Sequence, residues 1–177
     1  MSNPSEYVSN RFSSSLRLHR DTWASNVQQQ LNWWTPLRSV TKDRTIALCP
    51  SLFKIPIPND SVAWSIDLLR ESKKCNVLFP QLPTVLHASL SDADKKRIED
   101  DWTPVVINPG DVLVFSGAHL HGSVPNATMT PRYSSEVRTV DKRDISNNLG
   151  APNVDGKCTD YNIQWFKPII TGESSLL

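Results

Sequence analysis

Glycine and cysteine are scarce in this 177-residue sequence, and neither sign of charge dominates it. The three cysteines form no Cys-x-x-Cys pair, which argues against a zinc ribbon or a disulfide framework and favours the reducing cytoplasm. Nineteen Lys and Arg residues nearly balance eighteen Asp and Glu residues, so there is no basic excess with which to bind nucleic acid. No run of about 18 apolar residues is present, and the polar start of the chain lacks the apolar core of a signal peptide. We therefore expect a cytoplasmic protein without nucleic-acid or membrane partners.

Proline is abundant where glycine is not. Thirteen prolines at short intervals would cut any long helix, which argues against a helical bundle. The apolar segments are short, rich in Val, Ile, Thr and Trp, and bounded by Pro, Asn or Gly, as is typical of strands. Asn108-Pro109-Gly110-Asp111 predicts a turn between two of them. The predicted strands are Ser15–Leu18, Leu31–Leu37, Thr45–Leu48, Lys54–Ile57, Val105–Ile107, Val112–Phe115 and Val137–Val140.

Two helices are predicted between the early and the late strands, at Ser61–Lys74 and Ser91–Trp102. The second begins with Ser91 and has Asp94 three residues later, close to a capping box. Because the rest of the pattern is β, we predict one mainly β domain over residues 1–177, a jelly-roll or cupin-like barrel. Its core would span about residues 16–140, with a helical insertion at about 59–102. An irregular tail would follow over residues 141–177.

The chemistry-bearing residues are few, because the sequence has only four histidines. His19 and Asp21 form a His-x-Asp pair at the end of a predicted strand, where residues two apart point to the same face and can bind one ion. The third ligand would come from His121 or from its neighbour His119. Two histidines and one carboxylate leave positions open for a co-substrate and O₂, which suits a non-haem Fe(II) oxygenase. His87 precedes a predicted helix, and no role is assigned to it.

A carboxylate-binding pair follows eleven residues after His121. Arg132 and Ser134 are two apart, so a guanidinium and a hydroxyl could hold one carboxylate from the same face of a strand. Arg138 is a second candidate for this clamp, although it lacks a hydroxyl two residues further on and could be a surface charge at a strand end.

These motifs together resemble the Fe(II)/2-oxoglutarate-dependent oxygenase superfamily, and within it the phytanoyl-CoA dioxygenase type. The resemblance covers roughly residues 16–140 and implies a double-stranded β-helix. The family order of His-x-Asp, distal His and Arg-x-Ser is present. Besides the His-x-Asp pair, the resemblance rests on Gly110–Phe115, Leu120–Asn126 and Arg132–Ser134.

The resemblance implies a role for each motif. His19, Asp21 and His121 would hold Fe(II), and Arg132 with Ser134 would bind the distal carboxylate of 2-oxoglutarate. The implied reaction consumes O₂, releases succinate and CO₂, and oxidises a small organic molecule. Because the carboxylate ligand Asp21 is present, hydroxylation or a related oxidation is expected rather than halogenation.

Three further points remain expectations. The context of His121 and its spacing to Arg132 favour it over His119. Asn32, on the predicted strand after the His-x-Asp pair, could reach the 2-oxoglutarate carboxylate. Only 18 residues precede His19, fewer than in the family, which predicts a truncated N-terminus or a homodimer whose second copy covers the sheet.

The alternative function is a non-catalytic, cupin-type metal-binding barrel, which would not need Arg132 and Ser134. The sequence does not identify the substrate.

Overall fold

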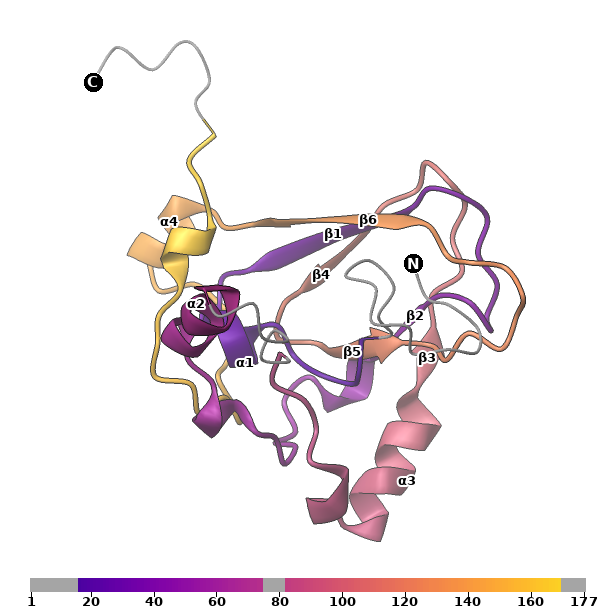
Figure 1. The fold of residues 1–177 in the computed structure, drawn as a ribbon, viewed down its shortest axis with the longest axis horizontal. Coiled ribbons are helices and arrows are strands. Elements are labelled where there is room, and N and C mark those ends of the chain that lie inside the picture. The colour runs from indigo at the N-terminus through magenta and orange to yellow at the C-terminus, as the bar shows by residue number, and fades with distance from the viewer. Residues whose placement is uncertain (1–15, 75–81, 170–177) are drawn as a thin grey trace.

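The computed structural model describes residues 16–74 and 82–169 of the chain. Two antiparallel three-stranded sheets lie at its centre (Figure 1). The first sheet has the order β4-β1-β6, with β1 at Leu31–Pro36, β4 at Leu113–Ser116 and β6 at Ser134–Thr139. The second has the order β3-β2-β5, with β2 at Ile46–Cys49, β3 at Thr103–Pro104 and β5 at Leu120–Ser123. The mainly β architecture predicted from the sequence is confirmed.

The two sheets pack face to face. Trp34 and Phe115 from the first sheet form one buried cluster with Ile46 and Leu48 from the second. Alternate residues of β1 are buried, as expected for a strand with one face on the core, whereas all of β2 is buried. Burying a side chain of this size stabilises the fold by about 1.5–3 kcal/mol relative to exposure. The space between the sheets is therefore a packed core, and the candidate site lies at one end of it.

The chain before His19 runs along the free edge of β5. His19 and His121 exchange two backbone hydrogen bonds of 2.9 Å, and the Ser123 amide donates to the Leu16 carbonyl. Gly122 lies in this seam, where a Cβ atom would meet the Leu18 nitrogen at 3.2 Å and the Arg17 carbonyl oxygen at 3.3 Å. The described part of the predicted first strand thus pairs with the segment that carries the second histidine.

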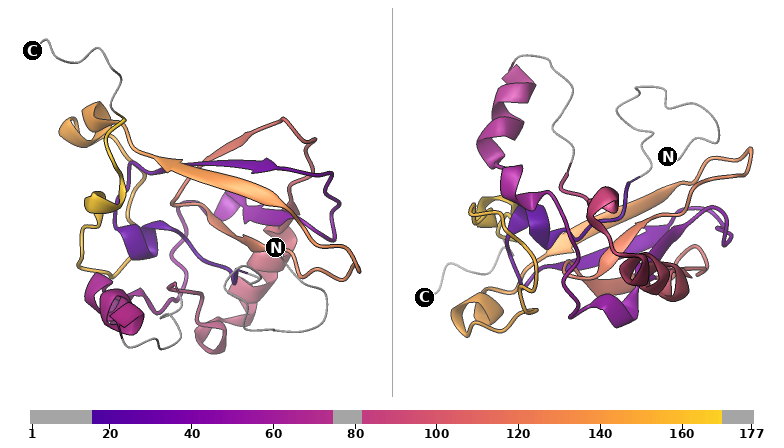
Figure 2. Two further views of the ribbon diagram at one scale, coloured as in Figure 1. Left: turned by 45° about the horizontal axis from the view of Figure 1, so that its top comes forward. Right: turned by 90° about the horizontal axis from the view of Figure 1, so that it is seen from below.

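The longer helices lie in the predicted insertion, and the described helices flank the sheets (Figures 1 and 2). The short α1 (Thr22–Ser25), α2 (Ile66–Lys74) and α4 (Lys142–Ser146) lie beyond one end of the sheets. Ser91 caps α3 (Asp92–Asp101) by accepting a hydrogen bond from the Asp94 amide, as its sequence predicts. Short 3₁₀ turns complete the set: η1 at Pro50–Leu52, η2 at Ser61–Ala63, η3 at His87–Ser89 and η4 at Ile163–Trp165.

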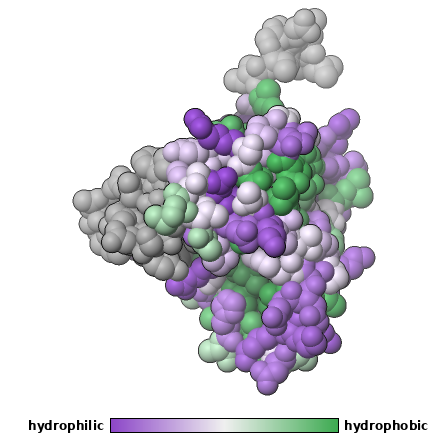
Figure 3. Space-filling view, turned by 90° about the vertical axis from the view of Figure 1, so that its right-hand side faces the viewer, coloured by the Kyte–Doolittle hydropathy of each residue, from purple (hydrophilic) through white to green (hydrophobic). Residues whose placement is uncertain are grey.

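Helix α3 has no buried residue. Hydrophilic side chains gather over the lower part of the molecule, where α3 lies (Figure 3). The charges on this helix are therefore a solvated face. Among the described residues, no helix combines the length and apolar character that crossing a bilayer requires.

Three local predictions were wrong. Lys54–Ile57 is not a strand, because the Ile55 carbonyl and the Ile57 amide bond the side chains of Arg20 and Asp155 instead of another strand. Val105–Ile107 is not a strand either, since the Val105 carbonyl accepts a hydrogen bond from the hydroxyl of Thr45 instead of from another strand. Leu120–Ser123 is strand β5, which is not among the predicted strands. The Pro109-Gly110 turn is present, with Gly110 at a φ of 100°.

Candidate metal centre

His19, Asp21 and His121 converge at the end of the space between the sheets. One ligand atom from each lies within 4.8 Å of the others, and all three side chains are buried. The backbone pair between His19 and His121 brings the two imidazoles together, with ring centroids 4.3 Å apart. Phe115 packs edge-on against His121 at 5.0 Å. His119, the rival to His121, turns away to pack on Phe53 at 4.4 Å.

Both imidazoles are fixed in the same tautomer. Nδ1 of His19 lies 2.7 Å from the Arg17 carbonyl, and Nδ1 of His121 lies 2.9 Å from the His119 carbonyl. A carbonyl oxygen only accepts, so each Nδ1 carries a hydrogen, and in its neutral form each ring presents a lone pair at Nε2. Burial lowers the pKa of His121 to about 4, which keeps this ring neutral near pH 7.

The two free imidazole nitrogens face the Asp21 carboxylate. His19 Nε2 lies 3.5 Å from Oδ1 and His121 Nε2 lies 3.9 Å from Oδ2. Within the described residues, the buried His19 Nε2 has no hydrogen-bond partner. Two lone pairs and a carboxylate in a buried space repel one another unless a cation lies between them. The donor set therefore fits a divalent metal ion, and two nitrogens with one carboxylate oxygen suit Fe(II).

Asp21 is held ionised by its neighbours. Burial alone would raise the pKa of this carboxyl, but its polar neighbours, among them the Arg138 guanidinium, outweigh burial and hold the pKa far below its usual range. Asn32 on β1 donates its side-chain amide to Oδ2, and Gln30 donates to the Asn32 oxygen at 2.8 Å. Both ends of the Asn32 amide are thus engaged within the protein. Its geometry makes it a support for Asp21.

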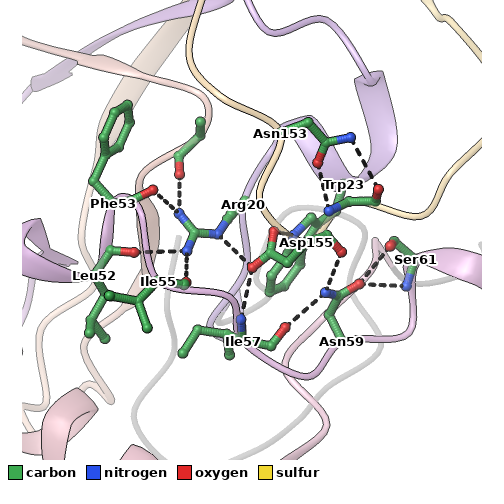
Figure 4. A network of polar contacts seen from close by, with 12 residues as sticks. Arg20, Trp23, Leu52, Phe53, Ile55, Ile57, Asn59, Ser61, Asn153 and Asp155 are labelled. Carbon is green, nitrogen blue, oxygen red and sulfur yellow. Dashed lines mark hydrogen bonds and ion pairs between the residues drawn. The ribbon is translucent and has the colours of Figure 1, made fainter.

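Arg20, the residue between the two ligands, is buried and anchors this turn (Figure 4). Its guanidinium donates to the carbonyls of Leu52, Phe53, Ile55 and Ala118 and pairs with Asp155 at 3.2 Å. Burial lowers the Arg20 pKa, although the Asp155 carboxylate acts to raise it. One side chain thereby ties the His-x-Asp turn to the loop after β2 and to the segment before β5.

Asp155 binds the other side of this network. It accepts hydrogen bonds from the Trp23 indole at 2.7 Å and from the Ile57 amide at 3.0 Å. The tail also reaches α1 through Asn162, whose amides bond the carbonyls of Ala24 and Ser25. The irregular tail predicted from the sequence is therefore a strap over the His-x-Asp turn.

Arg132 faces the same interior as the metal-ligand candidates. It is buried, and its Nη2 lies 3.4 Å from the hydroxyl of Ser123, which is two residues after His121 on β5 and so points to the same face. Its Nε and Nη1 atoms are buried and have no partner in the part of the chain that the structure describes. Burial lowers the Arg132 pKa. An unsatisfied, buried guanidinium is costly and fits a ligand carboxylate. Ser134, the partner predicted for it, begins β6 opposite Pro36.

Two functional candidates were missed or undervalued in the sequence. Arg138 is not a plain surface charge, since its Nη2 lies 3.2 Å from Asp21 Oδ1. Glu136, which was not considered, pairs with Arg138 at 2.9 Å, and burial raises its pKa. Their alternation with Ser134 along one strand was a usable signal. No pattern in the sequence could have indicated the pairing of Arg20 with Asp155, because the two residues lie 135 positions apart. His87 is exposed on η3.

A comparison with protein-family models finds a similarity over part of the chain. The family model described as phytanoyl-CoA dioxygenase matches residues 58–134, which include His121, Arg132 and Ser134 but not the His-x-Asp pair. The match confirms that the chain is similar to phytanoyl-CoA dioxygenases within the Fe(II)/2-oxoglutarate oxygenase superfamily. A search of curated proteins found no match.

Several solved structures are similar to the chain at low identity. EvdO2 from Micromonospora carbonacea var. aurantiaca matches with a TM-score of 0.46 and 17% identity, over 77% of this chain and 46% of that one. The same protein complexed with 2-oxoglutarate matches with a TM-score of 0.45 and 15% identity, over 80% and 51%. EvdMO1 matches with a TM-score of 0.43 and 18% identity, over 80% and 25%. The chain thus spans about half or less of the length of these structures.

Proposed function

We propose that this protein is a non-haem Fe(II)/2-oxoglutarate-dependent dioxygenase that hydroxylates a small organic molecule. The observation that carries the proposal is the buried set of His19, Asp21 and His121, whose imidazole nitrogens and carboxylate face one another, with His19 Nε2 lacking a hydrogen-bond partner among the described residues. The unsatisfied guanidinium of Arg132 supports it, because a simple metal-binding barrel has no use for one. The two packed sheets are proposed to be the core of a double-stranded β-helix.

Each residue of the chain has a defined part in this proposal. His19, Asp21 and His121 hold Fe(II) through two Nε2 atoms and one carboxylate oxygen, and Asn32 fixes the carboxylate. Arg132, assisted by Ser134, binds the distal carboxylate of 2-oxoglutarate and so orients it between the sheets. Phe115 and the buried strands exclude water from this space. When bound, the iron couples O₂ reduction and decarboxylation of 2-oxoglutarate to succinate and CO₂ with oxidation of the substrate.

We further propose that the substrate is a free small molecule and that the protein acts in the cytoplasm as a homodimer. The balanced charge of the sequence offers no basic surface for nucleic acid. The outer face of the first sheet exposes Leu31, Trp33, Val114 and Val137, and a second copy would cover these apolar side chains.

The proposal is tested by anaerobic titration of the metal-free protein with Fe(II) and 2-oxoglutarate. We expect a weak visible charge-transfer band, followed by succinate release when O₂ and a panel of candidate substrates are added. His121→Ala and Asp21→Ala should abolish both signals, and Arg132→Gln should abolish the band at 2-oxoglutarate concentrations that saturate the wild type. His87→Ala, which alters an exposed histidine away from the site, is the matched control and should leave both unchanged. Tight Fe(II) binding without a band would favour a metal-binding barrel without turnover.

A further inference from the structure

A charged pair on β6 lies at the partly open side of the candidate metal centre. Arg138 lies directly across from Asn32 in the sheet and Glu136 directly across from Trp34, so both share the inward face of β1. Their side chains are 39% and 25% exposed, whereas those of His19, Asp21 and His121 are 3–4% exposed. Among the described residues whose charged groups contact Asp21, Arg138 alone reaches solvent to this extent. A substrate approaching the open metal positions from this side therefore passes Arg138.

The contacts of Arg138 leave hydrogen-bond donors available. Its Nη2 lies 3.2 Å from Asp21 Oδ1, and its Nε and Nη2 lie 3.0 and 2.9 Å from Glu136 Oε1. Its Nη1 has no protein partner in residues 16–74 and 82–169. A guanidinium has five N–H donors and binds an oxyanion through two of them at once. A divalent cation on Asp21 would take over the compensation of that carboxylate, leaving Arg138 with Glu136 as its one anionic neighbour.

We propose that Arg138 recognises an anionic group of the substrate and that Glu136 orients its guanidinium. The inference rests on the proposed oxygenase function and names a substrate class for the same site, namely small organic anions. Arg138 contacts a ligand carboxylate, so an anionic group bound to it lies close to the metal. The oxidised carbon is then only a few bonds from that group. This role is separate from that of Arg132, which lies on the side of Ser123 and binds the co-substrate.

The recognition step is tested without turnover, in protein loaded with Zn(II), which suits a His₂-carboxylate site. The probe is propane-1-sulfonate, an anion that coordinates metals weakly, and 1-propanol is its neutral counterpart. Calorimetry should show that wild-type protein binds the sulfonate more tightly than the alcohol. Arg138→Gln should weaken sulfonate binding about ten- to hundredfold, the usual contribution of charge-assisted hydrogen bonds. Arg138→Lys should retain part of the affinity, and Glu136→Gln should raise it because a competing carboxylate is removed.

Three results would overturn the inference. These are unchanged sulfonate affinity in Arg138→Gln, equal loss in Arg132→Gln, or loss of the Fe(II)/2-oxoglutarate band in Arg138→Gln, which would make Arg138 the co-substrate clamp. Zn(II) affinity of Arg138→Gln should be equal to or higher than that of wild type, since a nearby cation is removed. Sulfonate affinity is expected to fall in Arg138→Gln and to rise in Glu136→Gln. Misfolding would lower the affinity in both variants, so the two explanations can be told apart. If wild-type protein gives no band but binds the sulfonate through Arg138, the proposed function fails while anion recognition by Arg138 stands.

Discussion

Asp21 is the residue on which the interactions of the site converge. Asn32 and Arg138 bond its two oxygens, and two imidazole nitrogens approach it within 3.9 Å. Asn32 and Arg138 lower the free energy of the ionised form in a buried position that would otherwise favour the neutral acid. The carboxylate is thus held charged and oriented before a metal arrives.

The buried neutral imidazole of His121 makes the stability of the metal-free protein depend on pH. Its pKa is about 4 in the folded protein and 6.5 ordinarily, so the unfolded chain takes up the proton first as the pH falls. The contribution is fully present above about pH 6.5 and is lost as the pH falls toward 4, by at most about 3 kcal/mol. Urea unfolding in the presence of a chelator at pH 7, 6 and 5 should show this decline.

The control for this prediction is His121→Gln, which cannot titrate in this range. Its free energy of unfolding should vary less between pH 7 and 5 than that of the wild type. An identical slope for the two proteins would mean that other groups govern the pH dependence.

At the scale of the elements, one arginine joins four segments of the chain. Arg20 bonds the η1 loop, the turn before β5 and the tail, and it belongs to the His-x-Asp turn itself. These segments contribute irregular backbone whose carbonyls would otherwise lack partners. In this part of the molecule Arg20 therefore supplies the hydrogen bonds that a neighbouring strand would supply in a sheet.

Replacing Arg20 by Met should lower the free energy of unfolding by about 3–5 kcal/mol, because Asp155 would remain buried without its partner. The affinity for Fe(II) should fall as well, since the turn that carries both ligands loses its anchor. Arg17→Met, at an exposed site in the same segment, should change the stability by no more than about 0.5 kcal/mol. Urea unfolding and Fe(II) titration measure the two effects. Equal stability of the two variants would contradict the anchoring role.

Element prediction succeeded where side-chain pattern alone determines structure. The alternation around Trp34 identifies β1, and the Ser91 cap identifies the start of α3. Element prediction failed where side chains hydrogen-bond the backbone, as Arg20 and Asp155 do at residues 54–57. Arg20 and Asp155 lie 135 positions apart, so the local sequence does not indicate these bonds. The same limit explains the site. Residue spacing brings His19, Asp21 and His121 to notice, but only the fold reveals that Asn32 and Arg138 bond the carboxylate.

At the scale of the whole molecule, an apolar sheet face is open to solvent. Trp33 lies between Val114 and Val137 on the outer side of the sheet, and all three are exposed. We predict that the protein is a dimer at micromolar concentration and that Trp33→Glu makes it monomeric, because a charge would be buried in the interface. Val62→Glu is the matched control, since Val62 is 71% exposed, compared with 41% for Trp33, and lies outside the sheet. Sedimentation velocity measures both, and a monodisperse wild-type monomer would contradict the prediction.

Gly122 is a residue outside the metal-ligand set on which the geometry of the metal centre depends. The glycine supplies no ligand atom, yet it is the neighbour of His121, and its lack of a side chain allows the backbone at Arg17 and Leu18 to come near. A single added methyl group would wedge the two main chains apart by a few tenths of an ångström and carry one imidazole away from the other. The close approach of the two main chains therefore limits which residues can stand at position 122. Replacing Gly122 by Ala would weaken metal binding even though all three ligand side chains remain.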